Sequence, residues 1–328
     1  MATWSELPLV SIAQNSSFVP QYYIPEIINQ ADEAMKIYPF AGQLEKYGMR
    51  DHVGQTFTGN IKVKIGTYTG AGTLTAGTKI ALTNIVNKSF VGTIAELGNG
   101  VKMENFLLNV SPSDIEGKSV RIALGEDIAD MLDVKVRNAC YTATTTKLLG
   151  GTYASAWGVL GTLANYKMSY NSIVRLTTEK MKNNIDGDIP LFIHPYQWED
   201  LVLETTTNQS FTDISKYSEK GYSQIIAGEI GKVGQYRVVV TNRVVGTKES
   251  GAGGTVQTAV AFAFKPELAV GFAWALPTEI RLEADYDTDF GRTQALAHYS
   301  QGCAVKMVDE YIFLLKTTVR ADIGAYAI

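Results

Sequence analysis

Alternating apolar and polar positions mark a candidate hairpin in the first third of the chain. Ile61, Val63 and Ile65 alternate with two lysines, the period of two that gives a β-strand one dry and one wet face. A Gly/Thr-rich turn region follows, and the segments KIALTNIV and KSFVGTIAE predict two further strands. Because residues 51–110 contain few bulky core residues, we interpret them as a long projecting β-hairpin. A lone two-stranded ribbon is marginal in water, so we expect it to rest on another surface.

A helical period dominates the next segment, from residue 119 to about residue 146. Apolar residues recur there at spacings of three and four: Leu124, Ile128, Met131, Leu132, Val136 and Ala139. Charged residues fall largely outside that stripe: Asp127, Asp130, Lys135 and Arg137. About 28 residues at 1.5 Å each predict a rod of roughly 42 Å, about twice the length of an average helix. A compact two-layer enzyme has no evident need for such a rod.

Residues 1–50 predict an extended arm, because the segment WSELPLVSIAQNSSFVPQYYIPEIINQ has three prolines and scattered aromatics without a sustained period. One short helix is expected at Pro25–Ala34, with the proline in its first turn and Ile27, Ile28 and Ala31 on one side. These few apolar groups need a surface from elsewhere. Two surfaces remain open at this stage: the core of the same subunit, or a neighbouring subunit that the arm straps.

The remainder of the chain predicts a mixture of helices and strands. A second helix is expected around residues 172–184, then the buried strand IPLFI, and then a helix opened by Pro195. GEIGKVGQYRVVVTNRV predicts a glycine turn and an apolar strand, GTKESGAGGT a flexible loop, and the last third mostly strands. We therefore predict an α+β protein with two lobes, one around residues 188–262 and one combining the long helix with the C-terminal strands.

Composition narrows the class of protein. The 328 residues are 45% hydrophobic and 19% charged, which is too apolar for disorder, and no apolar run approaches the roughly 18 residues of a membrane-spanning helix. Lys and Arg total 29 against 33 for Asp and Glu, so the net charge of −4 carries no basic excess for nucleic-acid binding. Two cysteines, three histidines and a start without a secretory signal suit a soluble protein of a reducing cytoplasm.

Motifs that could carry chemistry are weak. The glycines of GEIGKVG precede a strand, whereas a phosphate loop follows one and opens a helix, so we interpret them as turn glycines. Asp285, Asp287 and Asp289 have the opening spacing of a calcium loop. However, Phe290 and Leu296 occupy the glycine and glutamate positions, so an incidental acidic turn is favoured and a weak cation site stays open.

The remaining reactive side chains fit structural roles. His194 precedes Pro195 at a strand end and is expected to cap or pack, as is His298 within a strand. Cys140 and Cys303 are interpreted as small buried apolar groups. Because the sequence has no GxSxG, HExxH or CxxC motif, we predict no catalytic residue, no metal site and no cofactor.

The order of arm, hairpin, long helix and two lobes resembles the major capsid proteins of tailed bacteriophages, with the Johnson fold (Hong Kong 97-like). PSDIEGKSVRIALGEDIADMLDVKVRNACYTATTT is similar to that family's spine helix. PLFIHPYQWEDLVLETTTNQSF followed by GEIGKVGQYRVVVTNRV is similar to its strand, "HP", short helix, glycine turn and strand ending in "TN". The residues in those places are His194, Pro195, Gly228, Gly231, Gly234, Thr241 and Asn242.

The resemblance covers the chain nearly end to end and implies its domain organisation. Residues 1–50 would be the N-terminal arm and 51–110 the extended loop. Residues 111–187 and 263–328 would form the peripheral domain with the spine helix, and residues 188–262 the axial domain.

The resemblance also implies a function. The chain would be a non-enzymatic virion protein, assembled in the host cytoplasm into hexamers and pentamers of an icosahedral head around double-stranded DNA. Its expected partners are copies of itself, a portal protein, a scaffolding protein and packaged DNA held without sequence specificity, with a decoration protein left open and no membrane. The near-neutral charge agrees, because strongly charged subunits would repel one another across a shell.

Five residues are candidate inter-subunit contacts: Lys62, Lys64, Tyr22, Tyr23 and Phe40. We hypothesise that the two lysines pair with acidic groups of an adjacent subunit, with plain solvated strand lysines as the equal alternative. Two other functions stay open. One is an encapsulin-type nanocompartment shell, and the other is an uncharacterised α+β enzyme built on dispersed carboxylates such as Asp285 and Asp287.

Overall fold

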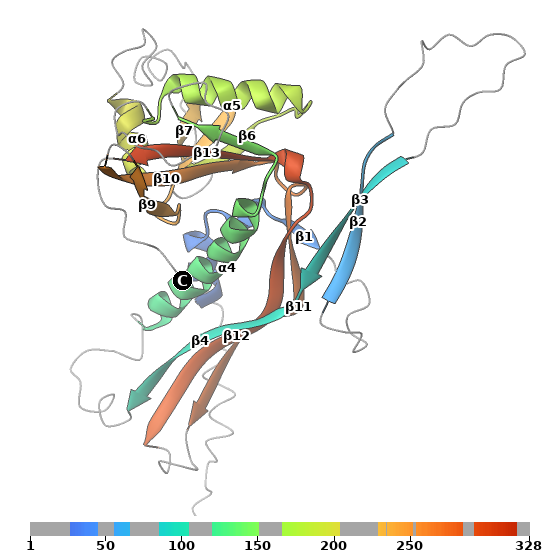
Figure 1. Cartoon of the computed structure of the whole chain (residues 1–328). Helices are drawn as coiled ribbons and strands as arrows, with labels where there is room; N and C mark the ends of the chain where they lie inside the picture. The colour runs from blue at the N-terminus through green and yellow to red at the C-terminus, as the bar shows by residue number, and fades with distance from the viewer. Residues whose placement is uncertain are drawn as a thin grey trace, which may run out of the picture.

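In a computed structural model, the described part of the protein has two large β-sheets, a long helix between them, two helices on the first sheet and a projecting two-stranded hairpin (Figure 1). The structure describes the following residues: 27–44, 56–65, 85–104, 120–150, 166–203, 229–233, 235–251, 254–284 and 292–319. The expectations for Tyr22, Tyr23 and the three aspartates at 285, 287 and 289 lie outside these residues. Within the described part, no helix is both long and apolar enough to cross a membrane.

The first sheet has seven strands, with the order β5-β13-β10-β6-β8-β7 and β9 paired to β10. Their bounds are β5 Thr146–Leu149, β6 Ile189–Ile193, β7 Glu229–Val233, β8 Tyr236–Val240, β9 Gly246–Gly251, β10 Gly254–Phe264 and β13 Ile312–Val319. The pairs β13–β5 and β6–β8 are parallel and the others antiparallel. Both faces of this sheet are covered, which explains why β6 is buried at every position.

Helices cover the two faces of this sheet in different ways. Helices α5 (Tyr170–Lys182) and α6 (Pro195–Val202) lie on one face, where Leu191 and Ile193 of β6 belong to their cluster. Phe192 points to the opposite face, where it stacks on Phe262 at 4.9 Å in the cluster that contains the long helix. The alternation along β6 therefore divides the apolar residues between two cores.

The second sheet has the order β1-β11-β12-β4 and extends away from the first (Figure 1). Its strands are β1 Gly42–Leu44, β4 Ala95–Glu104, β11 Val270–Ala284 and β12 Thr293–Lys306. Strand β1 is parallel to β11, and the other pairs are antiparallel. Strands β11 and β12 are long, and their pairing has register irregularities between Trp274 and Leu276 and between Leu276 and Glu279.

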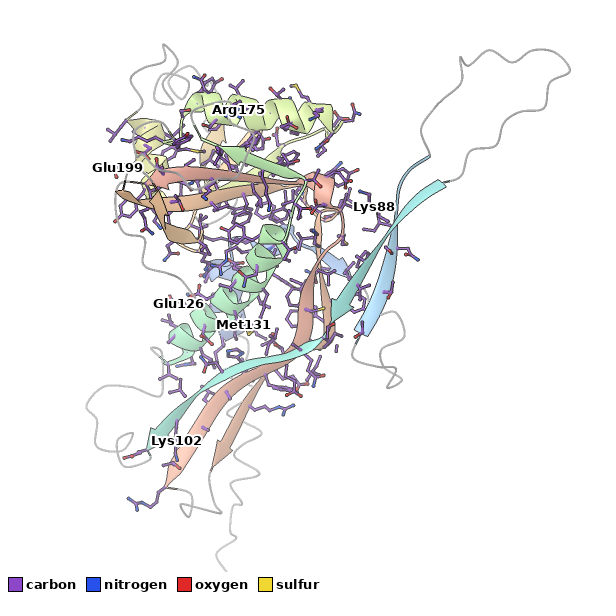
Figure 2. All side chains as sticks on the ribbon, in the orientation of Figure 1. Lys88, Lys102, Glu126, Met131, Arg175 and Glu199 are labelled. Atoms are coloured by element: carbon purple, nitrogen blue, oxygen red, sulfur yellow. The ribbon has the colours of Figure 1, made fainter. Side chains whose placement is uncertain are left out.

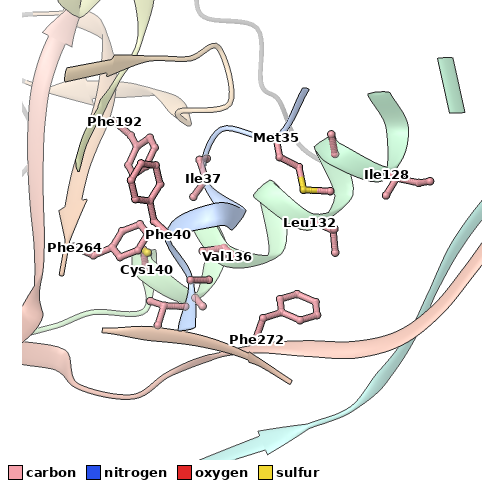
Figure 3. Packing of buried hydrophobic residues seen from close by; sticks show 14 of the residues in the cluster. Met35, Ile37, Phe40, Ile128, Leu132, Val136, Cys140, Phe192, Phe264 and Phe272 are labelled. Atoms are coloured by element: carbon pink, nitrogen blue, oxygen red, sulfur yellow. The ribbon is translucent and has the colours of Figure 1, made fainter. Parts of the chain in front are cut away.

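The long helix α4 spans Val120–Tyr141 and packs between the two sheets (Figure 3). Its 22 residues make a rod of about 33 Å, shorter than predicted. The prediction that the helix continues to about residue 146 is wrong, because β5 starts at Thr146 and pairs with β13. The expectation that Arg137 lies outside the apolar stripe is also wrong: it is buried, as is Asp133.

The described part of the predicted arm belongs to the core of its own chain. Residues 27–34 are helical, as predicted, and Ile27 and Ala31 are buried, whereas Ile28 is exposed and does not share their face. The chain continues through the 3-10 turn η2 (Tyr38–Phe40) into β1. Among the described residues, the alternative of an arm completed by its own subunit therefore holds over 27–44.

A two-stranded hairpin of β2 (Thr56–Ile65) and β3 (Ile85–Thr93) projects from this body, as the sequence predicted. The boundaries differ, because the second predicted strand is divided between β3 and β4, and β4 pairs with β12 in the second sheet. The pairing of β2 with β3 has an irregularity between Lys62 and Lys64. The unbroken period of two predicted across these lysines is therefore interrupted at the backbone.

Two further expectations need correction. The predicted second helix carries Ile173, Leu176 and Met181 as apolar residues, but only the first two are buried in α5. Met181 is 56% exposed, and the neighbouring Lys180 is buried. The segment predicted as a flexible loop forms β9, which is antiparallel to β10. The first sheet also takes β5 and β13 from the predicted peripheral segments, so it crosses the predicted 188–262 boundary. How these segments act as domains in an assembly stays a prediction.

Candidate assembly surfaces

The hairpin presents one face to solvent over residues 56–60 and 89–93. Pairs of β2 and β3 residues on this face, such as Thr58 with Val91 and Asn60 with Ser89, are all exposed. Val91 is 61% exposed, the second most exposed of the large apolar residues of the described structure. Among the described strands, β2 and β3 pair only with each other, so each has an outer edge with backbone groups that another chain can pair.

The opposite face of the hairpin is anchored at its base. Phe90 packs with Val305 and Met307 beside the end of β12, and Phe57 contacts Phe90 edge to face at 6.4 Å between centroids. The expectation that the ribbon rests on another surface is confirmed at this base. Gly92 makes the close approach possible, because a Cβ there would lie 2.5 Å from the Phe57 ring and 2.6 Å from the Val305 side chain.

An ion pair adds to this anchor. Lys88 of β3 contacts Glu310 of the 3-10 turn η5 (Asp309–Tyr311), and their side chains are 33% and 39% exposed. Burial would raise the pKa of the Glu310 carboxyl, but the hydrogen bond and charge of Lys88 outweigh burial and lower it. Figure 2 shows Lys88 on the hairpin near the point where it leaves the body.

A buried charge network joins the N-terminal segment to α4. Both oxygens of the fully buried Asp133 are occupied by donors: the amides of Lys36, Ile37 and Tyr38 and the guanidinium of Arg243. Burial raises the pKa of Asp133, and Arg243 and the three amides oppose that rise. Arg243 also binds Asp130 on the same helix, so one guanidinium connects the loop after β8 to two carboxylates of α4.

The residues that carry the family resemblance fix the ends of parallel strands. His194 caps α6 by accepting from the Tyr196 amide, and Gln197 accepts from the His194 amide at 2.8 Å, which completes a capping box. Thr241 donates its amide to the Ile193 carbonyl at 2.9 Å. The prediction of a capping histidine is confirmed. Burial lowers the pKa of His194 to about 4, so the ring is neutral and free to accept at neutral pH.

The two cysteines and His298 differ in burial and in their contacts. Cys140 is buried, and burial raises the pKa of its thiol, whereas Cys303 is half-buried with its pKa raised to about 11. His298 is buried, as predicted, and its Nε2 lies 2.7 Å from Asp127 Oδ2 across the interface of β12 with α4. No group of His, Cys, Asp and Glu among the described residues has the arrangement of a metal site.

The structure places the described candidate contact residues in different surroundings. Phe40 lies in the core, T-shaped against Phe192 at 5.6 Å, so its buried side chain is poorly placed to contact a neighbouring subunit. The backbone of Lys62 and Lys64 belongs to β2, and their pairing with a neighbour stays a prediction. Sequence reasoning missed Val91, Lys88 and Glu310, since the latter two are 222 residues apart and meet only in the fold.

Comparisons with solved structures identify the fold. The chain resembles the capsid of Ralstonia phage GP4, with a TM-score of 0.64 and 15% identity over 85% of this chain and 87% of that chain. It resembles the cyanophage Pam1 capsid, with a TM-score of 0.60 and 11% identity over 86% and 90%. It resembles the capsid of Helicobacter pylori bacteriophage KHP30, with a TM-score of 0.59 and 12% identity over 87% and 89%. No family model and no curated protein matches the sequence. The chain therefore has the Hong Kong 97-like capsid fold, as the sequence predicted.

Proposed function

We propose that this chain is a major capsid protein, a non-enzymatic shell subunit that assembles with copies of itself into an icosahedral phage head. The observation that carries this proposal is the hairpin β2–β3, which is anchored at its base and exposed on its other face, in a chain with a capsid fold. An isolated ribbon of this kind is marginal in water. A neighbouring subunit that covers it would complete its burial.

Assembly follows from how such a projection is used. A contact between the hairpin of one copy and the body of the next is head-to-tail, and contacts of this type generate rings when the rotation closes. Hexamers and pentamers are the rings that an icosahedral shell requires. Each contact can be weak, because contacts that close later in an assembly are intramolecular. In this proposal α4 is the spine helix and the hairpin is the extended loop, and Lys62 and Lys64 pair with acidic groups of the adjacent subunit.

Imaging of purified protein tests the proposal directly. We expect closed shells or hexameric rings in negative stain and a fast-sedimenting species in analytical ultracentrifugation. A protein that stays monomeric or forms a small oligomer up to the highest soluble concentration would overturn the proposal.

A variant of the exposed hairpin face sharpens this test. Val91→Glu places a charge on a side chain that is already 61% exposed, so the melting temperature should stay within about 2 °C of wild type. The yield of shells should fall at least tenfold, because a buried unpaired charge in each contact is costly. The matched control is Met181→Glu on α5, 56% exposed in the same chain, which should assemble normally. Equal yields for both variants and wild type would exclude the hairpin face from assembly.

The contents of the particle distinguish a virion from a cellular compartment. We propose that the shell encloses double-stranded DNA, with a portal and a scaffolding protein as further partners, and that its final location is the virion. Nuclease-resistant DNA in particles purified from the native source supports this, whereas a co-purified enzyme without DNA would favour the nanocompartment. The net charge of −4 suits DNA held by confinement and not by a basic patch.

A further inference from the structure

The short turn η5 (Asp309–Tyr311) touches three parts of the molecule with three consecutive residues. Asp309 binds the turn between α4 and β5, where its carboxylate accepts from the amides of Thr144 and Thr145 at 2.8–3.2 Å. It also accepts from Lys306 Nζ at 2.6 Å. Asp309 thereby fixes the C-terminal end of α4 to the connection between β12 and β13.

Glu310 reaches in two other directions. Its carboxylate contacts Lys88 of the hairpin, and its carbonyl oxygen accepts from Asn183 Nδ2 at 3.0 Å, just after α5. The hairpin and the end of α5, which covers the first sheet, are therefore linked through a single residue. The distance in sequence from Lys88 to Glu310 is 222 residues, so no local connection provides this link.

Tyr311 completes the junction. Its ring packs partly buried against all three of the largest apolar clusters: the one around α4, the one under α5 and α6, and the one at the hairpin base. Its carbonyl oxygen accepts from the Lys265 amide at 3.0 Å, and Lys265 Nζ lies 5.6 Å from the ring centroid. A displacement of η5 would therefore alter the packing of all three clusters, including the one at the hairpin base.

The contacts of η5 differ in accessibility. The Asp309 side chain is only 18% exposed and accepts hydrogen bonds from several donors. The side chains of Lys88 and Glu310 are 33% and 39% exposed. A half-exposed ion pair has water as a ready substitute and is the easier contact to exchange. The apolar contacts of Phe90 at the base would persist as a pivot when this pair opens.

We propose that η5 is a positioning joint for the hairpin and that the Lys88–Glu310 pair is its adjustable contact. The role in a shell rests on the proposed function. Identical chains around fivefold and sixfold rings must project their hairpins at different angles to reach the next subunit. A pivot of apolar side chains with one exchangeable ion pair beside it permits such a change without unfolding the base.

Hydrogen–deuterium exchange on the full-length protein tests the joint. Glu310→Gln removes the charge with little change in shape, and we expect amides of β3 near Lys88 to exchange about twofold to fivefold faster while those of β10 and β13 stay unchanged. The reversed pair Lys88→Glu with Glu310→Lys should restore the wild-type rate. The matched control is Glu179→Gln, which removes an exposed ion pair of α5 with Lys182 and should leave the hairpin unaffected.

Two results would overturn the joint: a wild-type exchange rate at the hairpin base in Glu310→Gln, or faster exchange throughout the molecule with no rescue by the reversed pair. This measurement is informative whether or not shells form, so its failure is separate from failure of the proposed function. Where shells form, Glu310→Gln should broaden their diameter distribution in cryo-electron micrographs. A distribution as narrow as that of wild type would refute a role in shell geometry.

Discussion

Replacing Asp133 by Asn should destabilise the protein strongly, because both carboxylate oxygens face donors. Oδ1 accepts from the amides of Ile37 and Tyr38 at 3.0 and 2.7 Å, and Oδ2 accepts from Lys36 at 2.9 Å and from Arg243. The side-chain NH₂ of an asparagine would point at one of these pairs of donors. The substitution therefore removes a buried charge and opposes donor to donor in a site without solvent access.

The size of the expected loss of stability follows from the burial of Asp133. Removing one partner of a buried ion pair costs about 3–5 kcal/mol, and the lower end applies because Asp130 still binds Arg243. An unfolding entropy of about 2.1 cal/mol/K per residue gives roughly 0.7 kcal/mol/K for 328 residues. If the chain unfolds as one unit, a loss of about 3 kcal/mol lowers the melting temperature by roughly 4 °C.

Asp130→Asn is the matched control, because Asp130 binds the same guanidinium from the same helix but is 32% exposed. We expect it to cost about 1 kcal/mol or less, since water can replace the lost partner. Urea unfolding of the unassembled subunit, followed by circular dichroism, measures the free energy of unfolding of both variants. The dependence of this free energy on urea concentration should be the same as in wild type. If the two variants lose equal stability, the assignment of Asp133 as the buried centre of the network is refuted.

Two further predictions concern the hairpin base and the α6 cap. Gly92→Ala should weaken the packing of the hairpin base by about 1–3 kcal/mol, seen as faster amide exchange in β3, because the added Cβ overlaps Phe57 and Val305; unchanged exchange would contradict this close approach. The folded-state pKa of His194, about 4, lies below the ordinary 6.5, so the folded state binds the proton less readily and stability should fall as pH drops from about 6.5 through about 4. His194→Asn keeps a capping acceptor that does not titrate and should flatten this part of the pH–stability profile. An unaltered profile would show that protonation of His194 is not the cause of the loss of stability.

The elements with a strong local period were predictable from the sequence. The strand IPLFI, the helix after Pro195 and the apolar strand Tyr236–Val240 lie where their patterns place them. The presence of a two-stranded hairpin was predictable from local alternation, although an irregularity between Lys62 and Lys64 interrupts its register. The end of α4 was not, because residues after Tyr141 are helix-compatible in pattern and only the distant β13 makes them a strand.

Buried charges were the principal error, and the reason is physical. Arg137 was predicted to lie outside the apolar stripe of α4, and Asp133 was not identified at all, yet both are buried. Asp133 accepts from residues 36–38 and from Arg243, about 100 residues away in both directions, and Arg137 donates to the Arg243 carbonyl as well as to the neighbouring Asn138. No local pattern contains that information. The same applies to Lys180, which is buried because the Gln235 side chain and a backbone carbonyl receive its ammonium group.

The residues that made the fold recognisable explain why the fold was easier to predict than the proposed assembly contacts. His194 and Gln197 complete the cap after β6, and Thr241 and Arg243 tie the end of the parallel strand β8 to β6 and α4. These contacts are intramolecular, so any chain with this architecture needs side chains of similar chemistry in those places. The exposed hairpin residues Thr58, Asn60, Ser89 and Val91 make up a face without intramolecular burial, so the fold of the single chain does not dictate their chemistry. A sequence pattern can therefore identify the architecture from its caps, whereas the exposure of Val91, on which the proposed assembly contact rests, is visible only in the structure.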